Sequence, residues 1–168
     1  MKSKILKMAI IIILLLAIID QGSKFLVIKY FSDFTSTSIV RIELVKNTGM
    51  AFGFNDGNTR NIVLSIIVLL IVLNFMKSQK ELIDNKTYIA LFVIIAGGLS
   101  NLIDRIFRQG IIDFIKIYTF PNFNLADIYI VIGWILIVIF LVRFTYKKDT
   151  EKSTNEEKGE NSNIENEK

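Results

Sequence analysis

Four long apolar stretches, separated by polar and charged segments, dominate the pattern of this chain. An α-helix rises about 1.5 Å per residue, so about 20 mostly apolar residues cross the roughly 30 Å hydrocarbon core of a membrane. The second and fourth stretches are shorter and need their polar flanks to complete a span. We therefore predict an all-α membrane protein with four transmembrane helices. The stretches are residues 8–28, 62–76, 87–103 and 128–142.

The first stretch follows three lysines, Lys2, Lys4 and Lys7, as the apolar region of a secretory signal peptide does. No small-x-small cleavage motif comes after it, and the apolar character resumes beyond Lys24. We interpret this segment as an uncleaved membrane anchor.

The longest connection, residues 29–60, lies between the first and second stretches. Within it, residues 40–44 (Val-Arg-Ile-Glu-Leu) alternate apolar and polar side chains, as a half-exposed strand does. Asn55-Asp56-Gly57 is a turn signal. We predict a small extracytoplasmic β-sheet in this connection, lying on the outer membrane surface.

Lys and Arg in short flanking segments indicate the orientation in the membrane. The two terminal flanks and the second connection are denser in basic residues than the remaining connections, so we expect both termini in the cytoplasm. The inner set is Lys2, Lys4, Lys7, Lys77, Lys80, Lys86, Arg143, Lys147 and Lys148, and the outer set is Lys29, Arg41, Lys46, Arg60, Arg105, Arg108 and Lys116.

Residues 147–168 differ in composition from the rest of the chain. They are rich in Asn, Glu, Lys and Ser, and Ile164 is their only large apolar residue. Such a segment has too little apolar surface to form a core. We predict one membrane domain over residues 1–146 and a disordered cytoplasmic tail over residues 147–168, for which docking to a partner is an alternative role.

The composition excludes several kinds of chemistry. The 168 residues include 20 Lys and Arg and 16 Asp and Glu, but no His and no Cys. Disulfides, thiolate nucleophiles and Cys-ligated metals are therefore excluded, and so is the usual general base near neutral pH. Hydrolysis must rest on carboxylates, Lys, Tyr, Ser or Thr, or an oxygen-bound metal. The basic residues flank apolar runs and form no stripe, so we expect no nucleic-acid partner.

Ionisable side chains at membrane depth are unfavourable and need a partner or a purpose. Asp20 and Lys24 are four residues apart, on one face of the first predicted helix, and are able to pair. They form either a structural ion pair or part of a polar pocket. Asp104 and Arg105, which end the third helix, likewise form either an interfacial cap or part of a site.

Asp113 and Asp127 are the most informative acidic residues. Asp113 lies between Ile112 and Phe114, and Asp127 opens the fourth stretch, where it is also able to cap a helix. The connection between them is short enough to bring them together at the outer boundary. Two close carboxylates share a proton and provide a general base and a general acid at the same pH. Such a pair can hydrolyse a peptide bond without His, Cys or a metal.

Four polar motifs occur in order along the chain, and together they resemble the bacterial signal peptidase II family, the lipoprotein signal peptidases, over residues 8–143. One such motif is weak evidence, whereas four in order are highly specific. The motifs are Asp20-Gln21-Gly22-Ser23-Lys24, then Asn47-Thr48-Gly49-Met50-Ala51-Phe52-Gly53, then residues 97–105 continuing to Gly110-Ile111-Ile112-Asp113-Phe114-Ile115, and finally Phe123-Asn124-Leu125-Ala126-Asp127.

The resemblance implies an intramembrane aspartic endopeptidase of the bacterial cytoplasmic membrane, which cleaves diacylglyceryl-modified prolipoproteins just before the lipidated cysteine. It implies a catalytic dyad of Asp113 and Asp127, a β-sheet cradle over the site and no cofactor or metal. We also expect a monomer in contact with membrane lipid. The other matched polar positions, implied to bind substrate or support the site, are Asp20, Lys24, Asn47, Gly49, Asn101, Asp104, Arg105 and Asn124.

Two positions depart from the family pattern. Ser100 stands where Gly is common, and it is small enough to preserve close packing. Met50 stands where Ala is usual, and we expect it to narrow or reshape the substrate cleft. Neither position belongs to the dyad.

Two other classes of function remain possible from the residues alone. A small transporter or channel subunit would use Asp20, Lys24, Asp104 and Arg105 as an ion path. A non-catalytic membrane assembly factor would tolerate Asn in place of both paired aspartates.

Overall fold

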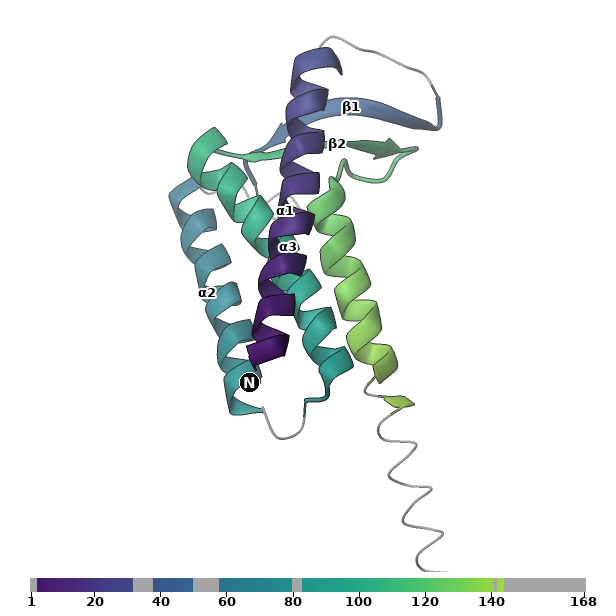
Figure 1. The fold of residues 1–168 in the computed structure, drawn as a ribbon. Coiled ribbons are helices and arrows are strands. Elements are labelled where there is room, and N and C mark those ends of the chain that lie inside the picture. The colour runs from purple at the N-terminus through teal and green to yellow at the C-terminus, as the bar shows by residue number, and fades with distance from the viewer. Residues whose placement is uncertain (1–2, 32–37, 50–57, 80–82, 141, 144–168) are drawn as a thin grey trace, which may run out of the picture.

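The computed structural model describes residues 3–31, 38–49, 58–79, 83–140 and 142–143. Its helices lie side by side, and a small sheet crosses one end of the bundle (Figure 1). The elements are α1 (Ser3–Phe31), β1 (Val40–Asn47), α2 (Asn58–Ser78), α3 (Asn85–Arg108), β2 (Ile111–Ile117) and a last helix, Leu125–Phe140.

The described residues of all four apolar stretches are helical, as predicted. Three of the described helices have the length and composition of membrane spans: Lys7–Phe31 within α1, Asn58–Ser78 and Asn85–Arg108. The last helix is also apolar but shorter over its described residues. The only proline of the chain, Pro121, precedes that helix, so no proline interrupts the helices.

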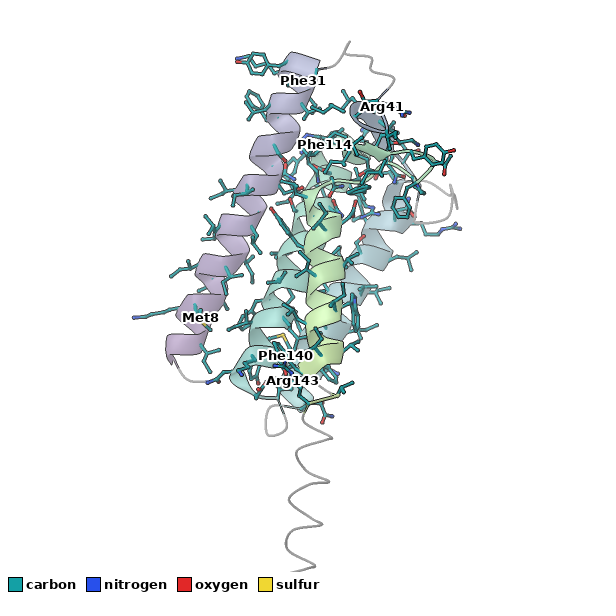
Figure 2. All side chains as sticks on the ribbon, turned by 90° about the vertical axis from the view of Figure 1, so that its right-hand side faces the viewer. Met8, Phe31, Arg41, Phe114, Phe140 and Arg143 are labelled. Atoms are coloured by element: carbon teal, nitrogen blue, oxygen red, sulfur yellow. The ribbon has the colours of Figure 1, made fainter. Side chains whose placement is uncertain are left out.

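The N-terminal part of α1 and the end of the last helix lie at one end of the bundle. Figure 2 shows Met8, Phe140 and Arg143 toward that end, whereas Phe31, Arg41 and Phe114 lie at the opposite end with the sheet. Residues 1–2 and 144–168 are outside the described residues, and so is the predicted disordered tail.

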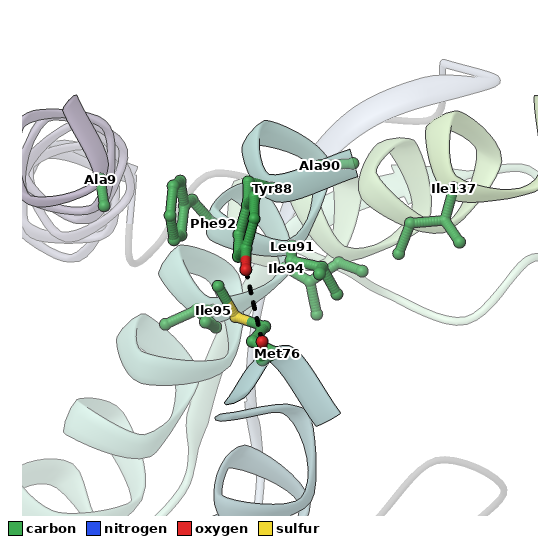
Figure 3. Close-up of a cluster of buried hydrophobic side chains, with 9 residues drawn as sticks. All are labelled: Ala9, Met76, Tyr88, Ala90, Leu91, Phe92, Ile94, Ile95 and Ile137. Atoms are coloured by element: carbon green, nitrogen blue, oxygen red, sulfur yellow. Dashed lines mark hydrogen bonds between the residues drawn. The ribbon is translucent and has the colours of Figure 1, made fainter. Parts of the chain in front are cut away.

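Helix α3 forms the centre of the bundle. Its buried apolar side chains form a core with Ala9 of α1, Met76 of α2 and Ile137 of the last helix (Figure 3). Gly97 and Gly133 allow the close contact between α3 and the last helix. A Cβ at Gly97 would lie 2.4 Å from the Ala126 carbonyl oxygen, and one at Gly133 would lie 2.4 Å from Ile94 Cγ1.

The sheet has two antiparallel strands, and only one of them comes from the connection predicted to form it. Strand β1 confirms the prediction from residues 40–44, but its partner β2 follows α3. Asp113 therefore lies on a strand, whereas the sequence predicted only a short connection between Asp113 and Asp127. Because most of β2 is buried, its apolar residues run almost continuously and lack the alternation that marks a half-exposed strand.

The chain turns sharply from α3 into β2. Gln109 has a left-handed backbone conformation with φ of 57°, which ends α3, and Gly110 follows it. A Cβ at Gly110 would lie 3.1 Å from the Asn47 carbonyl oxygen, so a glycine allows β1 to approach. This turn places Asp113, on β2, beside Asn47, on β1. The predicted turn at residues 55–57 and Met50 lie outside the described residues.

Candidate active site

Asp113 and Asp127 line one cavity of about 760 Å³ at the sheet end of the bundle. Asp113 belongs to β2, and Asp127 belongs to the first turn of the last helix. Asn47 from β1 and Asn101 from α3 line the same cavity. The structure thus brings together two carboxylates and two amides from four different elements.

The Asp113 carboxylate is buried and held by two amide groups. It is 2% exposed. Its Oδ2 accepts a hydrogen bond from Asn47 Nδ2 at 2.9 Å, and its Oδ1 accepts one from Asn124 Nδ2 at 2.6 Å. Burial raises the pKa of Asp113 to about 6, assisted by the charge of Asp127 and opposed by the two amide donors. Asp113 therefore keeps its proton to a higher pH than an ordinary aspartate.

The Asp127 carboxylate has a structural role at the helix start as well as a place in the cavity. Its Oδ2 accepts a hydrogen bond from the Asn124 backbone N–H at 3.1 Å, and Asn124 Oδ1 accepts one from the Asp127 N–H at 3.1 Å. This reciprocal pair is a capping box. Asp127 thus caps the helix, as the sequence allowed, but its Oδ1 also accepts a hydrogen bond from Asn101 Nδ2 at 2.8 Å.

Two asparagines connect the carboxylates to each other. Asn124 Nδ2, which donates to Asp113, also lies 3.3 Å from Asn101 Oδ1. Asn101 in turn donates to Asp127. Because both amides have fixed donors and acceptors, each carboxylate is held with a defined orientation toward the cavity.

A buried lysine lies behind the asparagines. Lys24 Nζ donates to Asn101 Oδ1 at 3.1 Å and forms ion pairs at 2.7 Å with both Asp20 Oδ2 and Asp104 Oδ2. All three charged side chains are fully buried. The predicted Asp20–Lys24 pair is confirmed, and Asp104 joins it from α3.

Asp20 connects α1 to the start of the last helix. Its Oδ1 accepts a hydrogen bond from the Ala126 N–H at 2.9 Å, directly before Asp127 in the chain. Its Oδ2 accepts one from Ser100 Oγ at 2.6 Å. Ser100, the departure noted in the sequence, therefore adds a hydrogen bond that glycine lacks.

Gln21 and Arg108 also belong to this cluster, and the sequence analysis did not select them. Gln21 Nε2 donates to Asp104 Oδ1 at 3.0 Å, and its Oε1 accepts from Arg108 Nη1 at 2.6 Å. Arg108 also forms an ion pair with Asp104. The cluster thus contains two carboxylates, Asp20 and Asp104, and two cations, Lys24 and Arg108. The i,i+4 spacing of Asp104 and Arg108 was a signal that could have identified Arg108.

Arg105 and Gly49 complete the set of predicted residues. Both line the cavity. Arg105 is half-buried, and its positive charge interacts with the carboxylates of Asp113 and Asp127. The Gly49 N–H donates to Asn47 Oδ1 at 3.0 Å, which directs the Asn47 amide nitrogen toward Asp113.

Away from the carboxylates, the cavity wall is apolar. Gly98 keeps part of it open, since a Cβ there would lie 3.0 Å from Leu69 Cδ2. The wall is formed between α2, α3 and the last helix, so the cavity extends from the carboxylates along the bundle. Its apolar side chains there are Leu64, Val68, Leu69, Val72, Ile94, Ile130 and Trp134.

Within the described part of the chain, no group of three or more Asp, Glu, His or Cys side chains is placed to hold a metal ion. The chemistry that this arrangement supports is general acid and base catalysis by two carboxylates. Fold and site together define a class: a multi-pass membrane protein with two carboxylates, one of them buried, in one cavity, the arrangement used by aspartic peptidases.

Comparisons with known proteins identify the family. The family model described as signal peptidase (SPase) II matches residues 12–143. The chain is 36% identical over 163 residues to a lipoprotein signal peptidase of Borrelia hermsii, covering 85% of this chain and 94% of that protein. It is 32% identical over 145 residues to a lipoprotein signal peptidase of Clostridium novyi, covering 81% and 98% of the two chains.

A solved bacterial membrane enzyme has a similar fold, with a TM-score of 0.71 and 31% sequence identity over 84% of this chain and 92% of that one. The chain belongs to the signal peptidase II family. It is an aspartic peptidase of bacterial membranes that cleaves the signal peptides of prolipoproteins.

Proposed function

We propose that Asp113 and Asp127 form the catalytic dyad and that cleavage falls just before the diacylglyceryl-modified cysteine of the prolipoprotein. The observation that carries this proposal is the shared cavity, in which both carboxylates are linked through Asn101 and Asn124. The cleavage position comes from the family resemblance, and the dyad comes from both the resemblance and the geometry.

In the proposed mechanism, one proton is shared between the two carboxyl groups. The ionised carboxylate removes a proton from a water molecule, whose oxygen attacks the scissile carbonyl carbon. The protonated carboxyl donates a hydrogen bond, and then its proton, to the carbonyl oxygen. When the tetrahedral intermediate collapses, the C–N bond breaks and the amine of the lipidated cysteine takes up the proton that was removed from the water. One hydroxyl of the intermediate returns its proton to the other carboxylate, which restores the singly protonated pair. The raised pKa of Asp113 favours retention of one proton on the pair, which titrates as a unit.

The apolar wall of the cavity supports the proposed position of the substrate. It extends from the carboxylates between α2 and the last helix, where the apolar stretch of a signal peptide could lie beside Val68 and Trp134. The acyl chains of the lipidated cysteine would then remain in the bilayer while its peptide bond reaches the dyad.

We further propose that residues 1–146 form the membrane domain with four crossings and that both termini face the cytoplasm. Under this orientation, the sheet and the dyad lie near the outer face of the cytoplasmic membrane. The positions of Met8 and Arg143 at the end opposite the sheet (Figure 2) support an even number of crossings.

The buried charges support this function over an ion path. Lys24 is paired with both Asp20 and Asp104 at 2.7 Å, and all three side chains are fully buried. A mobile proton or ion would have to break these pairs, and removing one partner of a buried pair is strongly unfavourable. The cluster is better suited to hold Asn101 in position.

The proposal is tested by cleavage of a diacylglyceryl-modified prolipoprotein with purified wild type, Asp113→Asn and Asp127→Asn. Asp84→Asn is the matched control, because Asp84 caps α3 at its other end and Asn is an equally good cap. We expect wild type and Asp84→Asn to cleave before the cysteine, while both dyad variants remain folded and inactive. Near-normal turnover by either dyad variant would contradict the assignment.

A further inference from the structure

The free end of the two-stranded sheet carries a cluster of exposed apolar side chains, which we call the sheet tip. Between 41 and 70% of each residue is exposed. Val40 pairs with Ile117 across the strands, and the Tyr118 N–H donates to the Ile39 carbonyl at 2.8 Å, so the side chains come from one end of the sheet. The sheet tip consists of Ile39, Val40, Ile117, Tyr118 and Phe120.

Helix α1 shows where the membrane surface lies at this end of the molecule. Its outward-facing apolar side chains continue beyond Lys24 as Phe25, Leu26 and Ile28. Lys29 and Tyr30 follow, and Lys29 Nζ lies 5.0 Å from the centre of the Tyr30 ring. Lys and Tyr near the end of an apolar helix are typical of the membrane–water interface. The interface therefore lies about 8 Å beyond Lys24 along α1, from the rise per residue.

The sheet leaves the bundle below that level. Asp113 on β2 is connected through Asn124 and Asn101 to Lys24, which links β2 to the part of α1 that precedes Lys29. Figure 1 shows α1 rising past the sheet. The last turn of α3, at the same end, also exposes two large apolar side chains, Phe107 at 79% and Ile106 at 48%. The sheet tip thus lies at a depth where neighbouring helices face lipid.

Two basic side chains lie next to the sheet tip, one on each strand. Arg41 and Lys116 face each other across the strands, one residue pair in from Val40 and Ile117. Arg41 forms a partly exposed ion pair with Glu43, while Lys116 is partly exposed. Apolar and aromatic groups with cations beside them match the layer in which acyl chains meet phosphate head groups.

We propose that the sheet tip inserts into the interfacial layer of the bilayer and binds phospholipid, so that it fixes the depth of β2 and of Asp113. The chain then holds the site at its depth from two sides, through the helices and through the sheet. This contact is additional to the peptidase activity and does not depend on which residues catalyse it.

The absence of Cys from the chain makes a direct test possible with single-cysteine variants. Tyr118→Cys and Ile39→Cys, one on each side of the tip, are labelled with a polarity-sensitive fluorophore and reconstituted in phosphatidylethanolamine–phosphatidylglycerol vesicles. Ile18→Cys, at a lipid-facing position in the middle of α1, is the deep reference. Asn85→Cys, at an exposed polar position at the start of α3, is the aqueous reference.

We expect both tip probes to emit at shorter wavelength than the probe at position 85. Lipids with a quencher near the head group should quench the tip probes more than lipids with a quencher deep in the acyl chain, and the probe at position 18 should show the reverse. Retained prolipoprotein cleavage shows that a variant is folded. If one of the two tip variants misfolds, the other tip variant is used for the test. Water-like emission without lipid quenching at the tip would overturn the proposal, whatever the outcome for the dyad.

Discussion

At the scale of single residues, the asparagines are as important to this account as the aspartates. Asn101 hydrogen-bonds both Asp127 and the buried Lys24. The sequence motifs indicated which polar residues belong together, but not their connections, because a motif gives the spacing along the chain and not the partner from another helix. Gln21 was overlooked for this reason, because its partner Asp104 lies on another helix. Arg108 was overlooked although its i,i+4 spacing from Asp104 on the same helix is visible in the sequence.

Replacement of Asn101 by Ala is therefore expected to affect both stability and activity. It removes a donor from Asp127 and an acceptor from Lys24, and a buried polar group left without its partner costs about 1–3 kcal/mol. We expect a lower unfolding temperature and a lower kcat with a smaller change in KM. Thermal unfolding in detergent and steady-state cleavage measure the two effects. Unchanged kcat in a folded variant would contradict the positioning role.

The pH dependence of cleavage follows from the raised pKa of Asp113, about 6. Because this pKa is raised, the proton stays bound up to a higher pH. The active, singly protonated pair therefore persists at pH values at which an ordinary aspartate is already ionised. We expect kcat/KM to fall as the pH rises through the upper apparent pKa of the pair.

Asn47→Ala tests in which direction the pH–rate profile moves when the pKa of Asp113 changes. The Asn47 amide donates to the Asp113 carboxylate and lowers its pKa, so its removal should raise that pKa further. We expect the alkaline limb of the pH–rate profile to move to higher pH. A shift to lower pH would show that Asp113 does not carry the proton lost in that limb.

At the scale of elements, the glycines of α3 and the last helix determine how closely these two helices approach each other. Small residues permit close helix approach, and Gly97 in the third apolar stretch has that role against the Ala126 carbonyl. The pairing of β1 with β2 was not predicted, because the pairing partner of a strand depends on the three-dimensional path of the chain.

Gly97→Ala should therefore destabilise the protein, by about 1–3 kcal/mol as for overpacking elsewhere. The new Cβ would lie 2.4 Å from the Ala126 carbonyl oxygen and would displace the start of the last helix, including Asp127. Gly22→Ala is the control, since a Cβ there has no heavy atom within 4 Å. Thermal unfolding should show a loss for Gly97→Ala and no loss for Gly22→Ala. Equal behaviour of the two variants would contradict this packing argument.

At the scale of the whole molecule, the hydrophobic pattern was sufficient to predict four helices, one strand and their order. The polar motifs were sufficient to select most of the polar residues that the structure gathers at one end of the bundle, but not Gln21 and Arg108. The disordered tail, the orientation of the termini, the crossing by the last helix and the monomeric state stay predictions. These properties depend on the membrane and on other molecules, and the chain alone does not determine them.

The central claim is that Asp113 and Asp127 act as one catalytic unit. The most direct measurement compares residual cleavage rates of Asp113→Asn, Asp127→Asn and the double variant under identical conditions. Groups that act as a unit have strongly non-additive effects. We predict that the double variant is no slower than the slower single variant. Losses that multiply in the double variant would show that the two carboxylates act independently and would contradict the dyad.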